Sequence, residues 1–527
     1  MQEYIRNSGG EIHTALRFLR GLPPFLRRSL DQRSVTSRLD DQLAMREEAF
    51  KTLLETAVFA NVRSPYTMLF NAARCEAGDV YSLLAREGLD ATLSSLHDAG
   101  IYLTLSEFKG QSPIERPGLE LQARPENFDN PLPRPRYVAK TGGSGGFPRR
   151  IHIDLGLLEH ESDYHAQFFA VHEATDRPLA VWHPSPPGAV AMKSALIHAR
   201  LGHPVDRWFS QREPASLRKH SLFTAATILT ARLCGTRIPK PEYTPAPDVQ
   251  RVVSWLAEQR SNGKPAILIT TPSACVRTCR AAVDHSASIE GTLFVLVGEP
   301  YTPAKAAVVR AAGCIAMCHY AMVETGMIGL ACAKGSALDD VHLVEDKIAT
   351  TQRAHQSNGR TVGALFHTTL LPSSPKVMIN VESGDYGVIE KRKCDCGILP
   401  SSFDRHLHTI RSYEKLTSEG MCFMGDDLLQ LLEHELPARF SGYPTDYQFV
   451  EREVDGLPKV SLVVSHAVGA LDEDGVVSSV LEFLRGRGVA QRMMADMWAQ
   501  GQTLRVVRGD PLVTIGGKIQ PLQTIAG

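Results

Sequence analysis

The stretch that decides the fold is "TLFVLVGEPYTPAKAAVVRAAGCIAMCHYA", residues 292–321. Its two apolar runs, "TLFVLVGEP" and "CIAMCHYA", are typical of buried strands, and the segment "TPAKAAVVRAAG" between them has a helical pattern. The runs "PLAVWHP", "PAILITTPS" and "GALFHTTLL" repeat the strand pattern elsewhere before residue 400. This alternation of strands and helices predicts an α/β fold with a substantially parallel sheet.

The pattern changes on both sides of this region. Up to about residue 110 the chain is mostly helical, as in "LDDQLAMREEAFKTLLETAVFANV" and "VYSLLAREGLDATLSSLHDAGI". After residue 410 a smaller α+β pattern begins, with "DYQFVERE" and "KVSLVVSHA" as strands and "GVVSSVLEFLRGRG" as a helix. We therefore expect a large N-terminal domain, 1–410, with a helical N-terminal region and mostly parallel sheets, and a small mobile C-terminal lid domain, 411–527.

Length and composition exclude several classes of protein. A chain of 527 residues is too long for a single hydrophobic core. The 57 lysine and arginine residues nearly balance the 58 aspartate and glutamate residues. The net charge therefore does not indicate binding to nucleic acid or to an anionic membrane. No apolar run approaches the roughly 18 residues that span a bilayer. The ten cysteines are scattered and do not form a secreted disulfide framework, so we expect a reducing, cytoplasmic location.

The glycine-rich stretch "KTGGSGGFPRR", residues 140–150, has two interpretations. It lacks the Gly-Lys-Ser/Thr ending of a Walker loop and the dinucleotide spacing G-x-G-x-x-G. It could be a flexible linker. Alternatively, its consecutive backbone N–H groups, with Thr141, Ser144 and Arg149 beside them, could bind a polyphosphate. The strand-like "RYVAK" before it and the regular pattern "IHIDLGLLEHESDYHAQFF" after it favour the phosphate loop.

The same loop carries a family resemblance. "TGGSGGFPR" resembles the phosphate-binding loop of the adenylate-forming superfamily, which includes acyl-CoA synthetases, peptide-synthetase adenylation domains and luciferases. Six further motifs follow in the family's order over about residues 60 to 520: "ITTPSAC" (269–275), "VGEPYTPAKAAVVRAAG" (297–313), "HYAMVETG" (319–326), "NVESGDYG" (380–387), "TIRSYEKLTSEGMCF" (409–423) and "VTIGGKIQPL" (513–522). The branch that fits best is the phenylacetate–CoA ligase-like one, which also contains CapK-type proteins.

The resemblance implies an adenylate-forming acid ligase that needs ATP and Mg²⁺. The phosphates would be held by the loop, residues Thr141, Gly142, Gly143, Ser144, Gly145 and Gly146. The other implied site residues are Gly298, Glu299 and Pro300 along the nucleotide pocket, Tyr320 near adenine, Asp385 at the ribose, Arg411 at the ribose or phosphate, Glu324 at Mg²⁺ and Lys518 between the carboxylate and the α-phosphate.

Each residue also has a structural explanation when taken alone. Glu324 could start a helix, Tyr320 could be a strand aromatic, Asp385 could belong to a Gly-Asp turn, and Lys518 could be solvated. Because all four residues occur in the family's order, the functional interpretation is favoured over the structural one.

Three stretches depart from the family. Ala321 follows Tyr320 where a glycine is usual, and "IRSYE" stands where the hinge usually reads Gly-Arg-x-Asp-Asp, with Tyr413 in place of the pivot aspartate and Glu414 beside it. "NVESGD" also lacks the aromatic and arginine residues that are common before the aspartate. These departures leave adenylation more secure than thioester formation.

The implied reaction activates an aryl or acyl carboxylic acid as its adenylate, releases pyrophosphate and passes the acyl group to a nucleophile. Coenzyme A is the expected acceptor, and a carrier-protein thiol or an amine is the alternative. An ATP-binding protein without catalysis is the rival class, and Lys518 argues against it. The expected partner is therefore a small-molecule acid, and neither nucleic acid nor a membrane is expected. The chain could form a homodimer.

Four further residues suggest a structural zinc ion. Cys332 and His342 lie ten residues apart, and "KRKCDCGIL" supplies Cys394 and Cys396. Cys₃His is a common structural zinc set, although Cys-x-Cys is a weaker signal than Cys-x₂-Cys and His342 could be an ordinary strand residue. Some phenylacetate–CoA ligase-like proteins have cysteines and a histidine at these motif positions and bind zinc. The resemblance therefore implies zinc here.

Overall fold

The computed structural model describes residues 2–27, 35–132, 134–140, 149–213, 218–357, 360–413, 417–418, 421–422, 425–454, 457–501, 503–514 and 516–525. The expected phosphate-loop residues Thr141, Gly142, Gly143, Ser144, Gly145 and Gly146 lie outside these ranges, as does Glu414 of the expected hinge.

One half of the main sheet is parallel. Its strands, in spatial order, are β10 (Ile315–Met322), β9 (Leu293–Val297), β8 (Ile267–Thr270), β5 (Leu179–Trp182), β6 (Arg207–Ser210) and β7 (Pro241–Tyr243). The strand–helix–strand pattern of residues 292–321 is confirmed, since β9 and β10 pair in parallel on either side of α12 (Pro303–Ala311). The predicted α/β class is confirmed with it.

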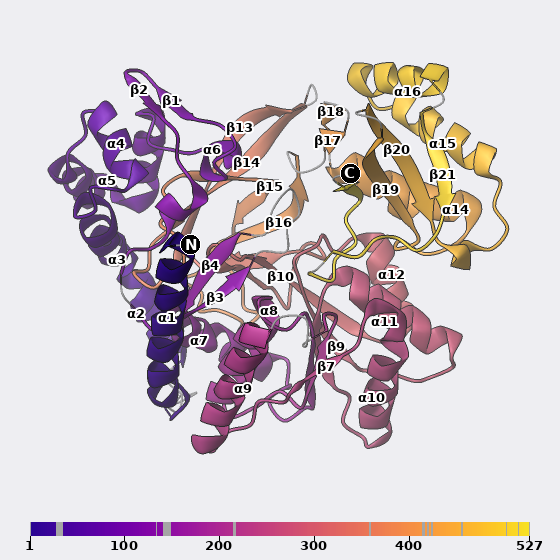
Figure 1. The fold of residues 1–527 in the computed structure, drawn as a ribbon, viewed down its shortest axis with the longest axis horizontal. Coiled ribbons are helices and arrows are strands. Elements are labelled where there is room, and N and C mark those ends of the chain that lie inside the picture. Colours follow the sequence, from indigo (N-terminus) through magenta and orange to yellow (C-terminus); the bar gives the residue numbers. More distant parts are fainter. Residues whose placement is uncertain are drawn as a thin grey trace.

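The other half of the sheet is antiparallel and continues from β10 (Figure 1). Its strands, in spatial order after β10, are β11 (Gly326–Ala331), β12 (Val341–Leu343), β16 (Arg405–Ser412), β15 (Val381–Lys391), β14 (Arg360–Thr369) and β13 (Ile348–Ser357). The two halves form one twelve-stranded sheet. It brings β10, β15 and β16 into one neighbourhood, although they are far apart in the sequence.

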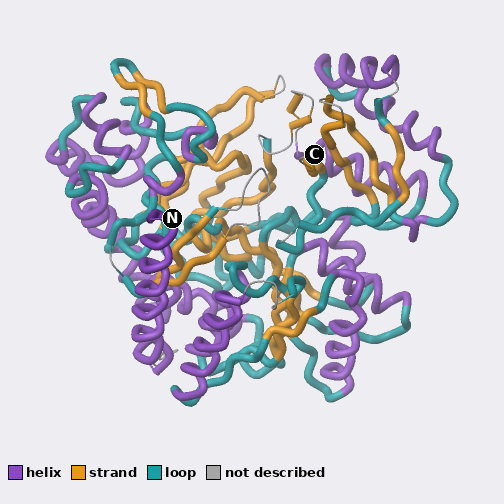
Figure 2. Tube along the Cα trace, in the orientation of Figure 1, coloured by secondary structure: helices purple, strands orange, loops and turns teal. Residues whose placement is uncertain are grey.

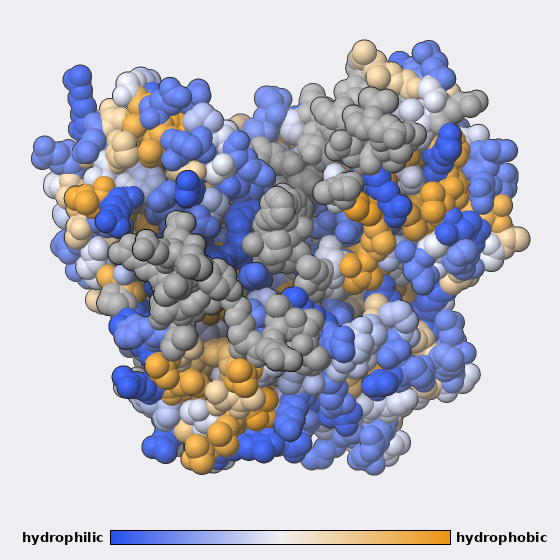
Figure 3. Space-filling view, viewed as in Figure 1, coloured by the Kyte–Doolittle hydropathy of each residue, from blue (hydrophilic) through white to orange (hydrophobic). Residues whose placement is uncertain are grey.

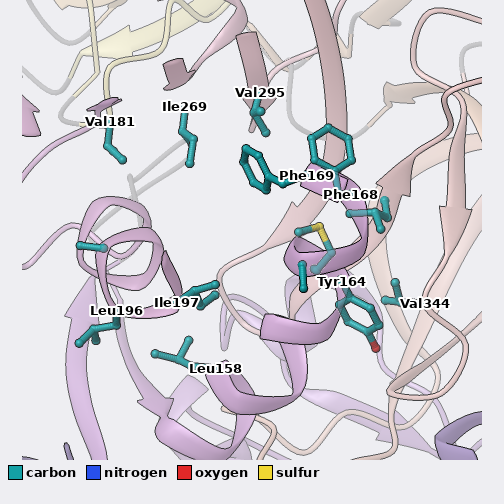
Figure 4. Close-up of a cluster of buried hydrophobic side chains, with 14 of the residues drawn as sticks. Leu158, Tyr164, Phe168, Phe169, Val181, Leu196, Ile197, Ile269, Val295 and Val344 are labelled. Atoms are coloured by element: carbon teal, nitrogen blue, oxygen red, sulfur yellow. The ribbon is translucent and has the colours of Figure 1, made fainter. Parts of the chain in front are cut away.

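Helices cover both faces of the parallel half, and the alternation of the strand side chains explains why. Ile269 and Val295 point into the cluster that α7 (Leu155–Val171) and α8 (Val190–Arg200) complete (Figure 4). Leu268 and Phe294 point into the opposite cluster, beneath α10 (Val249–Ser261), α11 (Pro272–Asp284) and α12. Burying one such side chain contributes roughly 1.5–3 kcal/mol, so strands that are apolar on both faces belong inside two helical layers (Figure 2).

The first 110 residues are mostly helical, as predicted, and a short hairpin follows them. Their elements are α1 (Gln2–Arg27), α2 (Val35–Ala44), α3 (Arg46–Leu53), α4 (Pro65–Ala72), α5 (Ala77–Asp98), α6 (Leu105–Phe108), β1 (Ile114–Arg116) and β2 (Leu119–Leu121). None of the helices in the described ranges is long and apolar enough to cross a bilayer. On the surface, α9 (Arg218–Leu233) exposes Leu222, Leu229 and Leu233, and apolar side chains gather over this region in Figure 3.

A hairpin flanks the glycine-rich stretch. The strands β3 (Arg136–Lys140) and β4 (Arg150–Asp154) pair in antiparallel register, with Lys140 opposite Arg150. Lys140 also donates its backbone N–H to the Pro187 carbonyl at 2.7 Å. Because the glycine-rich segment joins two paired strands that lie against the same large core, a linker between domains is the weaker of its two interpretations.

The C-terminal part has a sheet and a core of its own, as predicted. Four strands have the order β21 (Arg505–Arg508), β20 (Leu457–Val464), β19 (Tyr447–Val454) and β22 (Leu522–Ile525). The accompanying helices are α13 (Gly425–Gln430), α14 (Leu436–Phe440), α15 (Glu473–Arg485) and α16 (Val489–Gly501). Their apolar side chains form a separate buried cluster. The boundary expected after residue 410 falls within β16, and Tyr413 is still fully buried against Ala364 and Phe366 of the large sheet.

Candidate active site

The candidate site lies where β8, β9 and β10 end. Each of the first two strands leads into a helix that begins with Thr-Pro, because the threonine hydroxyl accepts a helix N–H and proline suits the first helical position. Thr271 accepts from Ala274 N–H at the start of α11, and Thr302 accepts from Lys305 N–H at the start of α12. In sheets of parallel strands, ligands bind at these carboxyl ends.

A first cavity of about 230 Å³ opens at this edge. Seven of the predicted site residues line it: Gly298, Glu299, Pro300, Tyr320, Asp385, Arg411 and Lys518. They come from the end of β9, from β10, β15 and β16, and from the C-terminal part of the chain. The fold thus brings together residues that are up to 220 positions apart, as the bond between Ile519 and Glu299 shows.

Asp385 and Tyr320 form one hydrogen-bonded group in this cavity. The Tyr320 hydroxyl donates to Asp385 Oδ2 at 3.0 Å, and the Ser412 hydroxyl donates to Asp385 Oδ1 at 2.6 Å. Burial, followed by the neighbouring Asp385 carboxylate, raises the pKa of Tyr320 well above its usual value. Tyr320 therefore stays a neutral donor. The nearly buried Asp385 carboxylate keeps lone pairs that could accept further hydroxyl groups.

Arg411 is held by two carboxylates. Its Nη1 lies 2.8 Å from Asp339 Oδ2, and its Nε lies 2.8 Å from Asp426 Oδ1. Asp339 also accepts the backbone N–H groups of Thr409 and Ile410, at 2.9 Å each. Arg411 therefore fixes the end of β16 to α13, at the place where the chain leaves the large sheet. Its contact with a nucleotide remains a prediction.

Glu299 has a different environment from the one expected of a residue that only lines a nucleotide pocket. Its Oε2 accepts from the backbone N–H and hydroxyl of Ser273, at 2.8 and 2.6 Å. Its Oε1 accepts from the backbone N–H of Ile519 at 2.9 Å. Glu299 thus connects the large sheet to the residue that follows Lys518. Thr271 supports the same loop by donating its hydroxyl to the Gly517 carbonyl at 3.1 Å.

Lys518 lies directly over Gly298. A Cβ atom added to Gly298 would be 2.8 Å from both Cε and Nζ of Lys518, and Gly298 has φ +89°, a conformation that favours glycine. Glycine at this position therefore permits the close approach of the lysine. Lys518 lines the first cavity and also a second cavity of about 270 Å³. The ammonium group thus stands where the two spaces meet.

The second cavity lies between the ends of β5, β8, β9 and β10 on one side and α7 and α8 on the other. Much of its lining is apolar, with Ile269, Val295, Val297, Met322 and Met327 among the lining residues. His183 and His319 line it as well. His183 follows an ordinary apolar run, and His319 opens the motif "HYAMVETG" without a role predicted for it. Their burial results from the pairing of strands that are distant in the chain.

Glu324 occupies the turn between β10 and β11 and is half-buried there. It follows directly after Met322 and Val323, which line the second cavity. Mg²⁺ in nucleotide sites is usually bound through one or two carboxylates plus the phosphates of the substrate. A single carboxylate at this turn fits that donor set, and the role of Glu324 remains a prediction.

The predicted cysteine and histidine set comes together in space. Cys332 follows β11, His342 lies in β12, and Cys394 and Cys396 follow β15. Their four ligand atoms all lie within 4.8 Å of one another. Cys332 Sγ is 3.6 Å from Cys394 Sγ, and His342 Nε2 is 3.1 Å from Cys396 Sγ. With Zn–S bonds of about 2.3 Å, a tetrahedral ion separates two sulfur ligands by about 3.8 Å, so the donor set fits zinc.

A second set of polar residues packs beside these four ligands. His406 packs against His342 with ring centroids 4.0 Å apart, and its Nδ1 is 2.9 Å from Asp340 Oδ1. Arg392 Nη2 lies 2.7 Å from Asp340 Oδ2. Hydrogen bonding to the Cys332 thiol holds the pKa of Cys396 below its usual value. A thiolate at Cys396 suits a metal cation.

No family model matches the chain, and no curated protein matches its sequence. Solved structures do match it. One is 2-hydroxyisobutyryl-CoA ligase in complex with 2-HIB-AMP and CoA, at 16% identity, covering 93% of this chain and 90% of that chain with a TM-score of 0.46. Another is ATP-bound MatB from Rhodopseudomonas palustris, at 15% identity, 73% and 66% coverage and a TM-score of 0.39. A third is McyG A-PCP with phenylalanyl-adenylate, at 13% identity, 73% and 64% coverage and a TM-score of 0.39.

Proposed function

We propose that this chain is an adenylate-forming acid ligase of the phenylacetate–CoA ligase-like branch. It activates a carboxylic acid with ATP as an acyl- or aryl-adenylate and passes the acyl group to coenzyme A, or alternatively to a carrier-protein thiol or an amine. The observation that carries this proposal is the position of Lys518 between two cavities. One cavity is lined by Tyr320 and Asp385 and suits a nucleoside, and the other has the apolar lining that suits an acyl group.

The first chemical step needs positive charge at this junction. A carboxylate oxygen of the acid attacks the α-phosphorus of ATP, the bond between the α- and β-phosphates breaks, and pyrophosphate leaves. Negative charge collects on the α-phosphate oxygens and comes close to the carboxylate. The Lys518 ammonium would stabilise that charge in a site with little water, where electrostatic interactions are strong.

The nucleotide would be held by residues of the first cavity. The Asp385 carboxylate would accept the ribose hydroxyls, Tyr320 would lie beside adenine, and the segment 141–146 would bind the phosphates through its backbone N–H groups. Glu324 would hold Mg²⁺. When bound, this ion neutralises phosphate charge and helps pyrophosphate to leave.

Contacts between the two parts of the chain favour the adenylation step. Glu299 accepts the N–H of Ile519, Lys305 Nζ lies 2.7 Å from Glu433 Oε1, and Arg280 Nη1 lies 2.7 Å from Asp446 Oδ1. These bonds hold Lys518 at the junction. We propose that residues 411–527 form a lid that releases this arrangement before transfer. In that second step the acceptor thiol loses its proton to solvent, its sulfur attacks the acyl carbon, the bond between that carbon and the phosphate oxygen breaks, and AMP leaves.

We further propose that Cys332, His342, Cys394 and Cys396 hold a structural zinc ion. The ion would connect the end of β11, β12 and the segment after β15. The strand β11 begins two residues after Glu324, and β15 contains Asp385. Zinc would therefore fix the distance between two parts of the nucleotide site without contacting ATP.

One experiment tests the proposed activity. Purified protein is mixed with ATP, Mg²⁺ and a panel of aryl and alkyl acids, and pyrophosphate release is measured. Acid-dependent release supports an adenylating enzyme. If the protein binds ATP but no acid in the panel stimulates release, the chain is an ATP-binding protein and the proposal is wrong. Repeating the reaction with coenzyme A, a carrier protein or an amine then identifies the acceptor.

A further inference from the structure

One lysine is accessible on a buried helix that borders the second cavity. From Ala191 to Arg200, α8 buries every residue except Lys193. The Lys193 side chain keeps 17% of its surface accessible, and it lines the second cavity together with Val190 and Ser194 of the same helix. Because its helix neighbours are buried, the accessible part of this side chain faces the cavity.

Lys193 forms an ion pair with Oε2 of Glu161, a fully buried residue of α7. The Nζ atom of Lys193 is not completely buried, whereas the Glu161 Oε2 that it faces is. Glu161 Oε1 accepts from Lys347 Nζ and from the backbone N–H of Met327, at 2.9 and 2.8 Å. Burial alone would raise the pKa of Glu161, but Lys193 and then Lys347 hold it well below its usual value. Two ammonium groups therefore share one carboxylate.

The charges around this cavity are mostly positive. Its lining contains four cations: Lys140, Lys193, Arg212 and Lys518. It contains no aspartate or glutamate among the residues that the structure describes. Behind the lining, the carboxylates of Glu161 and Asp346 lie near the ammonium group of Lys347. Positive charges therefore outnumber negative ones even when the buried carboxylates are included.

The other polar groups of the lining leave one cation for the remote part of a bound acid. Burial holds the pKa of each lining histidine below its usual value, so these rings are neutral: His165, His183 and His319. Lys140 is exposed, and Arg212 also borders a neighbouring cavity. Lys518 faces the reacting groups in the proposed function. Lys193 is therefore the cation available to a group of the acid that does not react.

Two glycines of the lining mark the places of the two charged groups. Lys518 lies over Gly298 at the end of β9. Gly326 begins β11, and a Cβ atom added there would collide with Glu161 Oε1 and lie 3.1 Å from Lys347 Nζ. The carboxylate that pairs with Lys193 therefore lies directly behind Gly326.

The pairing of the strands gives the distance between these two places. Gly326 pairs with Met322 of β10, and Val297, the residue before Gly298, pairs with His319. Two strand spacings of about 4.8 Å and a shift of two residues, about 3.3 Å each, put the two glycines roughly 12 Å apart. If each ammonium group binds its acceptor at about 2.9 Å, roughly 6 Å remains between the two acceptor groups. The carboxylates of glutaric, adipic and terephthalic acid have a similar separation.

We infer that Lys193 binds a second carboxylate of the acid and that the preferred substrate is a small dicarboxylic acid, an inference that rests on the proposed function. Lys518 would lie at the carboxylate that is activated, and Lys193 at the one that is not. An ammonium group has three donors, so Lys193 can keep its bond to Glu161 and still donate to a ligand. The second carboxylate would also offset the positive charge around the cavity. The cavity of about 270 Å³ is smaller than the usual 300–1,000 Å³ of sites for drug-sized ligands, which favours a small acid.

Matched acids test this inference. We would compare glutaric with pentanoic acid, adipic with hexanoic acid, and isophthalic and terephthalic acid with benzoic acid. The monoamide of each diacid replaces the second carboxylate by a neutral acceptor of the same shape. The measurement is kcat/KM for pyrophosphate release. We expect at least one diacid to exceed both its parent acid and its monoamide by roughly 10- to 150-fold, the usual effect of a hydrogen bond to a charged group. Parent acids or monoamides that react as fast as every diacid would overturn the inference.

Variants at Lys193 identify the responsible group. K193M removes the cation, and Glu161 keeps its bonds from Lys347 and Met327, so the buried carboxylate is not left unpaired. The ratio of kcat/KM for the diacid to that for its parent acid should fall by roughly 10-fold or more in K193M. K193R should keep most of this ratio, because it keeps the positive charge. K264M is the matched control, since Lys264 is exposed after α10, and it should keep the wild-type ratio. A wild-type ratio in folded K193M would refute the assignment.

The outcomes separate this inference from the proposed function. If wild-type protein releases no pyrophosphate with any acid, the proposed adenylation is wrong and the inference falls with it. If acids react without regard to a second carboxylate, adenylation stands and only the inference falls. Thermal unfolding of each variant shows whether it folds. The wild-type acid panel decides the question even if K193M does not fold.

Discussion

Glu299 offers the sharpest test of how Lys518 is placed. Sequence resemblance predicts that Glu299 lines the nucleotide pocket, and the structure shows it bonded to Ser273 and to the N–H of Ile519. We expect E299A to undock the Lys518 loop while ATP still binds. E299Q should have a smaller effect, because the amide can accept one of these bonds but turns a donor toward the other.

The magnitude follows from the bonds that are lost. A hydrogen bond to a charged group contributes about 1.5–3 kcal/mol. Removing the bond from Ile519 at 2.9 Å should therefore shift the balance between docked and undocked loop by roughly 10- to 150-fold. The bond from Thr271 to Gly517, at 3.1 Å, and the ion pairs of Glu433 and Asp446 remain. The adenylation rate should accordingly fall by no more than this factor.

The assay measures pyrophosphate release and ATP affinity in parallel. The expected result for E299A is a lower kcat with nearly unchanged ATP affinity, since only the lysine is displaced. E242Q is a matched control, because Glu242 pairs with Arg207 on the exposed surface and should leave both values unchanged. A loss of ATP affinity as large as the loss of rate would refute the docking role and support direct binding of the nucleotide by Glu299.

The remaining predictions concern the lysine, the glycine loop and the metal cluster. K518A should reduce adenylate formation by on the order of 10²–10³ while ATP affinity and the unfolding temperature stay unchanged, and an unaltered rate of pyrophosphate release would contradict its role. Replacing Gly143 and Gly145 together by valine should weaken ATP binding because side chains block close approach to the phosphates, whereas a linker would tolerate the change. Metal analysis should find about one zinc per chain, lost with a lower unfolding temperature in the double variant C394S/C396S; metal-free wild-type protein with full stability would contradict this.

Much of the fold could be predicted because local and tertiary signals agree. The run "LFVLV" has apolar side chains on both faces of β9, which requires helices on both sides of the sheet, and Thr302-Pro303 marks where the next helix begins. The antiparallel half was harder to predict. The second part of β13 is partly exposed and mostly polar, so it lacks the apolar alternation that marks a strand in the sequence. Its long antiparallel pairing with β14 places it at the edge of the sheet.

The candidate site also has a part that the sequence predicts and a part that it does not. Motifs in the family's order contain four of the site residues, Gly298, Tyr320, Asp385 and Lys518. The fold places all four around one cavity. The docking role of Glu299 could not be predicted, since its partner Ile519 lies 220 positions away. Distance along the chain hides such pairs, because the sequence shows that a carboxylate is present and not which N–H group it meets.

The histidines of the second cavity show a further reason why sequence patterns are insufficient. His183 follows the apolar strand β5 and His319 lies within β10, and a lone histidine in such a position is usually a satisfied core residue. Here the backbone N–H of Ala331 in β11 donates to Nδ1 of His319 at 3.0 Å, and this bond leaves the proton of the neutral ring on Nε2. The tautomer of His319 is thus decided by the neighbouring strand rather than by the histidine itself. A substitution that moved β11 relative to β10 would remove this bond and allow the other tautomer of His319, even if it changed no residue of the cavity lining.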